Sequence, residues 1–151
     1  MLSVGSPAPL FTTTDQNGCV VSLGDFKGRK VILYFYPKDN TPACTTQACN
    51  LRDNYNALLE QGYIVLGISP DSALSHTKFI AKQQLPFSLL VDTDTQIAQQ
   101  YGVWRLKKFM GREYMGIVRT TFVIDETGNI SEIIDKVETK NHAAQIGLGV
   151  L

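Results

Sequence analysis

Short apolar segments alternate with amphipathic segments along most of the chain. Residues 30–36 (KVILYFY) are continuously apolar and rich in β-branched and aromatic side chains, which is typical of a central strand covered on both faces. Further strands are predicted at 64–69, 87–91, 121–125 and 130–137. Asn17-Gly18 predicts a hairpin turn between 11–15 and 19–23, and 126–129 predicts a second hairpin turn.

Helical spacing marks the segments between these strands. In residues 45–61 apolar side chains recur at intervals of three and four, which gives one apolar stripe. Asp71-Ser72 can cap a helix over 73–84, which Pro86 closes. Shorter helices are predicted at 94–101 and 142–151. Strand–helix–strand units followed by a hairpin and a helix predict a three-layer α/β sandwich, without fixing the strand order.

Length and composition favour one ordinary globular domain over residues 1–151. The chain has 151 residues, of which 44% are hydrophobic and 19% charged, so it is unlike a disordered chain. Fourteen Lys and Arg balance fourteen Asp and Glu, which argues against a nucleic-acid partner held through its phosphates. The start of the chain has no secretory pattern, and the apolar run at 31–36 is much shorter than the roughly 20 residues that span a bilayer. We therefore expect no membrane partner and a cytoplasmic location, with an organelle location after removal of a transit peptide left open.

The three cysteines, Cys19, Cys44 and Cys49, favour thiol chemistry over a disulfide framework, because their number is odd and no export signal is visible. Cys44 falls in the first turn of the predicted helix that follows the apolar strand, where the helix dipole and unpaired backbone N–H groups stabilise a thiolate. Thr41 can bring its hydroxyl near this sulfur, and Pro37 stiffens the loop between them. The alternative is that Cys44 is simply a small buried residue, as free cysteines usually are.

The chain resembles the peroxiredoxins, and among them the peroxiredoxin Q, or bacterioferritin comigratory protein, subfamily. Pro37, Thr41 and Cys44 match the family pattern Pro-x-x-x-Thr-x-x-Cys, and Cys49 matches the second cysteine of the subfamily. Arg119 matches the active-site arginine of the family. The similarity extends over nearly the whole chain and includes residues 5–9, 67–71, 85–87 and 116–122.

The resemblance implies a thioredoxin-like fold with an N-terminal β-hairpin extension and a cysteine peroxidase without cofactor or metal. It implies that the Cys44 thiolate reduces a hydroperoxide and becomes a sulfenic acid, that Cys49 forms a disulfide with it, and that thioredoxin or a glutaredoxin-type dithiol protein reduces the disulfide. Arg119, the Thr41 hydroxyl and the Cys44 backbone N–H are then the expected donors to the breaking O–O bond. Members of the subfamily are commonly monomeric, so a monomer is expected.

Two positions depart from the family pattern. Gln47 stands where Glu is common, so the arginine is expected to be held less firmly, and Ala43 stands where Gly is common, so a strained positive φ is not expected there. Among the remaining polar residues, His76 is expected to be a solvated helix residue, Cys19 to be a structural or exposed strand cysteine, and His142 to have no chemical role.

Other functions stay open at this stage. A dithiol–disulfide oxidoreductase is disfavoured because no Cys-x-x-Cys is present, and a metal module built on Cys44, Cys49 and a histidine lacks a second ligand pair at zinc-site spacing. No feature of the sequence discriminates for or against a chaperone role. Residues five apart on an α-helix point about 140° apart with Cα atoms about 8–9 Å distant, whereas a disulfide tolerates only up to about 7 Å. We therefore predict that disulfide formation between Cys44 and Cys49 requires the first turns of their helix to unwind.

Overall fold

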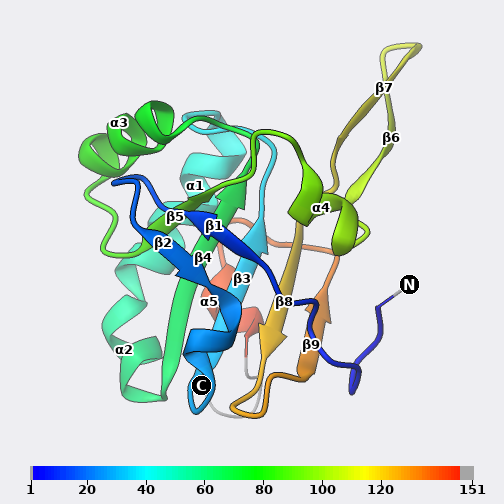
Figure 1. Cartoon of the computed structure of the whole chain (residues 1–151). Helices are drawn as coiled ribbons and strands as arrows, with labels where there is room; N and C mark the ends of the chain where they lie inside the picture. Colours follow the sequence, from blue (N-terminus) through cyan, green and yellow to red (C-terminus); the bar gives the residue numbers. More distant parts are fainter. Residues whose placement is uncertain (1, 147–151) are drawn as a thin grey trace.

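A central five-stranded sheet organises the fold, which a computed structural model describes for residues 2–146 (Figure 1). The strands lie in the order β5-β4-β3-β8-β9. Their bounds are Lys30–Phe35 for β3, Tyr63–Ser69 for β4, Ser88–Val91 for β5, Thr120–Ile124 for β8 and Ile130–Ile134 for β9. β3, β4 and β5 are parallel, while β8 is antiparallel to both β3 and β9. All five strands confirm the prediction, with ends that shift by at most three residues.

The apolar run of β3 lies at the centre of this sheet, as its composition predicts, and it divides the core in two. Val31, Leu33 and Phe35 point into one cluster of buried side chains. Ile32 and Tyr34 point into the other cluster, as the alternation of side chains along a strand requires. Both faces of β3 are therefore covered, and the continuous apolar sequence is explained by burial on two sides.

Helices cover both faces and complete three layers. Their bounds are Pro42–Asp53 for α1, Tyr55–Glu60 for α2, Ala73–Gln83 for α3, Gln96–Gln100 for α4 and His142–Gln145 for α5. Helices α1, α2, α3 and α5 contribute buried residues to the cluster around Ile32, and α4 contributes Ile97 and Ala98 to the opposite cluster. The three-layer α/β prediction is confirmed.

The predicted helix over 45–61 is two helices. α1 begins earlier, with Pro42 as its first residue, and Asn54 (φ −107°, ψ 7°) separates it from α2. α3 follows the prediction closely, and the Ser72 hydroxyl accepts from the Ser75 N–H as its cap. The predicted terminal helix over 142–151 is described only as α5, because its last five residues lie outside the described part of the chain.

Two antiparallel hairpins form two-stranded sheets that are separate from the central sheet. The predicted N-terminal hairpin is present as β1 (Thr12–Thr14) and β2 (Val20–Ser22), followed by a 3-10 turn over Leu23–Phe26. The second, β6 (Trp104–Phe109) and β7 (Arg112–Ile117), projects away from the body of the molecule (Figure 1) and was not predicted. Met110 and Gly111 both have positive φ in its turn, a conformation that Asn-Gly usually signals in a sequence.

No helix within residues 2–146 combines the length and the apolar character that are needed to cross a membrane.

Candidate active site

Cys44 lies at the beginning of α1, directly after the loop that leaves β3. Thr41 is the N-cap residue in extended conformation, Pro42 is the first helical residue, and the Thr45 N–H donates to the Thr41 carbonyl over 2.8 Å. The Cys44 side chain is 2% exposed. Its backbone N–H belongs to the first turn of the helix, where N–H groups lack carbonyl partners and the dipole is positive. The predicted setting of this thiol is present.

Arg119 is the cationic side chain that reaches this sulfur. It precedes β8, whose first residue pairs with Phe35 at the end of β3, so the sheet brings it beside the start of α1. Its Nη2 donates to Cys44 Sγ over 3.2 Å, and its Nη1 donates to Gln47 Oε1 over 2.6 Å. The fork of the guanidinium thus spans two residues of one helix. Cys44 and Arg119, which are 75 residues apart in sequence, meet as predicted.

Gln47 is the residue of α1 that holds the guanidinium of Arg119. Its side chain is fully buried, and its short hydrogen bond to Arg119 is made through the amide oxygen. An amide carries no charge, so the positive charge of Arg119 is not neutralised by this partner and acts on the sulfur. The Gln47 Nε2 has no hydrogen-bond partner among the described residues. Ala43 has no positive φ, as expected.

Tyr34 of β3 provides the buried wall behind the cysteine. Burial first, and then the charge of Cys44, raises the pKa of Tyr34 well above its ordinary value. Its ring therefore remains a neutral phenol at every physiological pH, and its hydroxyl has no partner within residues 2–146. Tyr34 stacks on Tyr36 with ring centroids 5.3 Å apart.

Thr41 and Pro37 lie in the loop before α1, where the sequence places them. The Thr41 hydroxyl donates to the Lys38 carbonyl over 2.8 Å, so its proton is committed within the loop rather than to the sulfur. Asn40, between these residues, has a positive φ of 61°. The loop is therefore tightly folded, and the Thr41 oxygen retains lone pairs that can accept a hydrogen bond.

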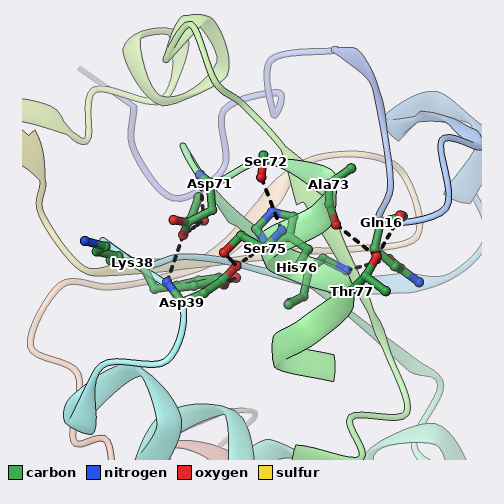
Figure 2. A network of polar contacts seen from close by, with 12 residues as sticks. Gln16, Lys38, Asp39, Asp71, Ser72, Ala73, Ser75, His76 and Thr77 are labelled. Atoms are coloured by element: carbon green, nitrogen blue, oxygen red, sulfur yellow. Dashed lines mark hydrogen bonds and ion pairs between the residues drawn. The ribbon is translucent and has the colours of Figure 1, made fainter. Parts of the chain in front are cut away.

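A buried polar network fixes this loop to α3 (Figure 2), and His76 is its centre. His76 Nδ1 lies 2.7 Å from Asp39 Oδ2, and His76 Nε2 lies 2.8 Å from the Leu90 carbonyl oxygen. The His76 side chain is 0% exposed and that of Asp39 is 3% exposed. The expectation that His76 is solvated is wrong. The signal was its spacing of three from the apolar Phe79, which places both side chains on the buried face of α3.

Other donors complete the ring of contacts around Asp39. The Tyr36 hydroxyl donates to Asp39 Oδ1 over 2.5 Å, and the Ser75 hydroxyl donates to Oδ2 over 2.8 Å. The Asp39 N–H donates to Asp71 Oδ2 over 2.8 Å. A carbonyl only accepts, so Nε2 of His76 carries a proton. The hydrogen bond between His76 Nδ1 and Asp39 Oδ2 then completes a buried pair in which Asp39 also accepts from two hydroxyls.

Asp39, Asp71 and His76 are also the described side chains whose ligand atoms come close enough to share an ion, within 4.8 Å of one another. Both nitrogens of His76 are already engaged within the protein, as are the Asp39 oxygens. Neither Cys44 nor Cys49 belongs to this group. The hydrogen bonds thus account for the cluster, and the metal module considered from the sequence gains no support.

Cys49 lies one and a half turns after Cys44 on the same intact helix. All three cysteines are free thiols, and Cys49 is half-buried. Its sulfur donates to Gln83 Oε1 over 3.4 Å, and Arg52 Nη1 donates to the carbonyl of the same Gln83 over 2.7 Å. α1 is thereby attached to the end of α3 on the side away from Cys44. The two cysteines do not meet in this conformation.

The remaining candidates lie elsewhere. Cys19 is exposed beside β2, as expected. His142 is fully buried, with Nε2 2.8 Å from the Thr121 hydroxyl and Nδ1 2.8 Å from Gln145 Oε1. Burial lowers the pKa of His142, so its neutral form is favoured in the fold. It anchors α5 to β8, and the charge of Arg119 adds to the lowering of its pKa.

Comparison with known proteins points to one group. A family model described as AhpC/TSA family matches residues 4–133. The chain is 45% identical over 144 residues to peroxiredoxin Bcp of Bacillus subtilis, covering 95% of this chain and 92% of the relative. It is 48% identical over 141 residues to peroxiredoxin Bcp of Escherichia coli, covering 93% and 90%.

The same group appears among solved structures. A structure of the bacterioferritin comigratory protein of Xanthomonas campestris, determined to study its alkyl peroxide reduction activity, superposes with a TM-score of 0.85. Its sequence is 31% identical, and the match covers 90% of this chain and 87% of that one. The thioredoxin-like fold implied by the sequence is confirmed.

Proposed function

The chain belongs to the AhpC/TSA family, in its peroxiredoxin Q or Bcp group, and on this premise we propose that it is a thiol peroxidase that uses Cys44. Its substrates are hydrogen peroxide and organic hydroperoxides. The observation that carries the proposal is the 3.2 Å contact of Arg119 Nη2 with a buried thiol at a helix N-terminus. A structural cysteine has no need of a cation held against its sulfur.

The first step is a displacement at oxygen. The Cys44 thiolate attacks the terminal oxygen of ROOH, an S–O bond forms and the O–O bond breaks. The leaving RO⁻ takes a proton and departs as water or an alcohol, while the sulfur retains OH as a sulfenic acid. Negative charge moves from sulfur to the leaving oxygen during this step, so donors aimed at that path stabilise the transition state.

We assign three groups to the stabilisation of this moving charge and of the bound peroxide. Arg119 touches the sulfur with one nitrogen of its fork, and the Cys44 N–H lies at the positive end of α1. Thr41 takes a role that differs from the expected donor. Because the Thr41 hydroxyl donates its proton to the Lys38 backbone carbonyl, its oxygen is free to accept a hydrogen bond from the protonated end of the peroxide. Pro37, half-buried at the start of the loop, limits the access of water.

Cys49 resolves the sulfenic acid. Its thiolate attacks Cys44 Sγ, the S–O bond breaks, hydroxide leaves as water, and a disulfide forms. Both cysteines lie on the intact helix α1, about 8–9 Å apart at Cα by helix geometry, so α1 must open first. Opening also separates Cys44 from Arg119, so peroxide reduction stops until a thioredoxin or glutaredoxin-type dithiol protein reduces the disulfide. We take the enzyme to act as a monomer of one domain over residues 1–151.

Peroxide consumption by purified protein, with dithiothreitol as the reductant, tests the activity and its thiol. Cys44→Ser should lose essentially all activity, and Cys19→Ser, which changes an exposed thiol, should retain it. Comparable losses in both variants would remove Cys44 from its assigned role. A wild-type protein that consumes no peroxide would end the proposal and leave a dithiol oxidoreductase or a chaperone to be tested.

Amide hydrogen exchange over residues 44–52 tests the opening of α1. Protection should be high in the reduced protein and should fall in the disulfide form. In Cys49→Ser the sulfenic acid should persist, and excess peroxide should convert it to sulfinic acid, which mass spectrometry detects. Equal protection in the two redox states would refute the opening of the helix, although not the peroxidase activity.

A further inference from the structure

The hairpin formed by β6 and β7, residues 104–117, combines exposed apolar side chains with positive charge. Its exposed large apolar residues are Leu106, Phe109, Met110, Tyr114 and Met115. It carries Arg105, Lys107, Lys108 and Arg112 but only one acidic residue, Glu113. The whole chain is formally neutral, so this excess of cations is a local property of the hairpin.

The pairing register separates these side chains onto two faces. Leu106 lies opposite Met115, and this pair continues outward from Trp104 and Ile117, which pack in the core. The other face carries Arg105, Lys107 and Phe109, opposite Gly116, Tyr114 and Arg112. The first face is therefore apolar up to the Lys108–Glu113 ion pair (3.5 Å) near the tip, and the other face is cationic and aromatic. Both faces of the hairpin are exposed along most of their length. Exposed apolar area of this kind usually marks an interaction surface.

The hairpin lies at the same end of the molecule as Cys44. β7 ends at Ile117, and Arg119, which donates to Cys44 Sγ, follows two residues later. Thr120, the first residue of β8, pairs with Phe35 at the end of β3 from which the loop to α1 departs. Figure 1 shows the hairpin rising beyond that end of the sheet. A protein that comes to the cysteine from solution therefore meets the hairpin beside it.

We propose that this hairpin is the docking surface for the protein that reduces the Cys44–Cys49 disulfide, a dithiol reductase with an acidic surface around an apolar patch. The inference rests on the proposed peroxidase function, which requires such a visitor at every turnover. Cations are attracted to an acidic partner over roughly 10 Å at ordinary salt, and the apolar tip then supplies contact area. Charge complementarity raises the rate of encounter more than the strength of the final complex.

Docking promotes a thiol–disulfide exchange between the reductase and the Cys44–Cys49 disulfide. A thiolate of the reductase attacks one sulfur of the disulfide, the S–S bond breaks, and the released cysteine takes a proton. The second thiol of the reductase then attacks the mixed disulfide. Two electrons and two protons pass to Cys44 and Cys49, and the reductase leaves with its own disulfide.

The test compares a protein reductant with a small one. Arg105→Glu/Arg112→Glu reverses two exposed cations on the hairpin whose side chains make no hydrogen bond or ion pair within residues 2–146. Lys27→Glu/Arg29→Glu makes the same change in net charge just before β3, at the opposite end of the sheet from Cys44. Peroxide turnover is measured with an acidic thioredoxin, its reductase and NADPH, and separately with dithiothreitol. A glutaredoxin with glutathione is tested in parallel.

The hairpin variant should raise the KM for thioredoxin, or for the glutaredoxin if that is the reductant used, by about tenfold or more. The difference in this KM between the hairpin variant and the wild type should shrink at high salt. Its turnover with dithiothreitol should equal that of the wild type, and the control variant should match the wild type in both assays. Phe109→Ser/Met110→Ser should also raise this KM, with little dependence on salt.

Each contrary result overturns the docking proposal without touching the peroxidase. An unchanged KM for the protein reductant would do so. A loss of turnover with dithiothreitol as large as the loss with the protein reductant would also do so, because it would place the effect in the active site. Turnover with dithiothreitol but with neither protein reductant would do so too. Sedimentation showing that the hairpin variants abolish a dimer, with KM unchanged, would assign the surface to a second copy of the chain. Failure of wild type with dithiothreitol would instead refute the peroxidase.

Discussion

Replacing His76 by Gln should destabilise the protein by about 3 kcal/mol, because it removes one half of a buried hydrogen-bonded pair. His76 and Asp39 face each other over 2.7 Å with side chains that are 0% and 3% exposed. Removal of one partner from a buried pair of this kind typically costs about 3–5 kcal/mol, since the other polar group is left without compensation. The Tyr36 and Ser75 hydroxyls still donate to Asp39 in the variant, so the lower end of that range applies.

Urea denaturation measures this effect. With a slope of about 2 kcal/mol per molar urea, a loss of about 3 kcal/mol lowers the midpoint by about 1.5 M. Asp39→Asn should cause a comparable loss, because it leaves the buried His76 ring without its carboxyl partner. The double variant Asp39→Asn/His76→Gln removes both partners and should be at least about 2 kcal/mol more stable than the sum of the single effects implies.

The same variants should slow the reaction with peroxide, because Asp39 anchors the loop that carries Thr41. The single variants should lower the rate of Cys44 oxidation in single-turnover experiments, and the double variant should recover part of it. Single effects below about 1 kcal/mol that simply add in the double variant would show that the two side chains contribute independently, and the coupling expected from their hydrogen bond would then be wrong.

Three further outcomes follow from contacts described above. Arg119→Met should slow peroxide reduction even at a pH high enough to ionise Cys44 fully, because the guanidinium also stabilises the transition state; recovery of the wild-type rate at high pH would reduce its role to ionisation. The lowered pKa of His142 means that the unfolded chain takes up this proton first as pH falls, so its contribution to stability is present above the ordinary histidine pKa and is lost below it. Urea midpoints at pH 7.5 and pH 5 should therefore differ less in His142→Gln than in the wild type. Gly67→Ala should cost about 1–3 kcal/mol in thermal or urea unfolding, because its Cβ would lie 2.6 Å from Leu89 Cδ2 and 2.8 Å from Tyr34 Cζ, and an unchanged midpoint would mean that both side chains shift freely.

The sequence predicts the central layers well because their signals are local. The apolar run of β3 and the capped helix α3 each carry their signal within a dozen residues. The hairpin over 104–117 was missed, because the alternation of apolar and charged residues from Trp104 to Lys107 lasts only four residues and Met110-Gly111 is an unusual turn pair. The break at Asn54 was also missed, since the apolar spacing of three and four continues across it.

The site shows the same division between local and distant information. The motif around Cys44 marks the thiol, and the resemblance marks Arg119 and its contact with Gln47, but neither predicts that one guanidinium nitrogen reaches Gln47 while the other reaches the sulfur. The pair of His76 with Asp39 joins residues 37 positions apart, and no local pattern reports a contact of that length. The sequence locates Thr41 in the loop before α1, but the acceptor of its hydroxyl, the Lys38 carbonyl, depends on the loop conformation around Asn40.

The interruption at Asn54 sets how much of the protein takes part when α1 opens. A continuous helix from Pro42 to Glu60 would propagate fraying into the segment that carries Leu58, which is buried against the sheet. Because Asn54 departs from helical geometry between α1 and α2, α1 is expected to open as a cooperative unit of its own while α2 remains packed. In the proposed mechanism the two redox states then share a common scaffold, and the structural change is confined to about three turns of helix.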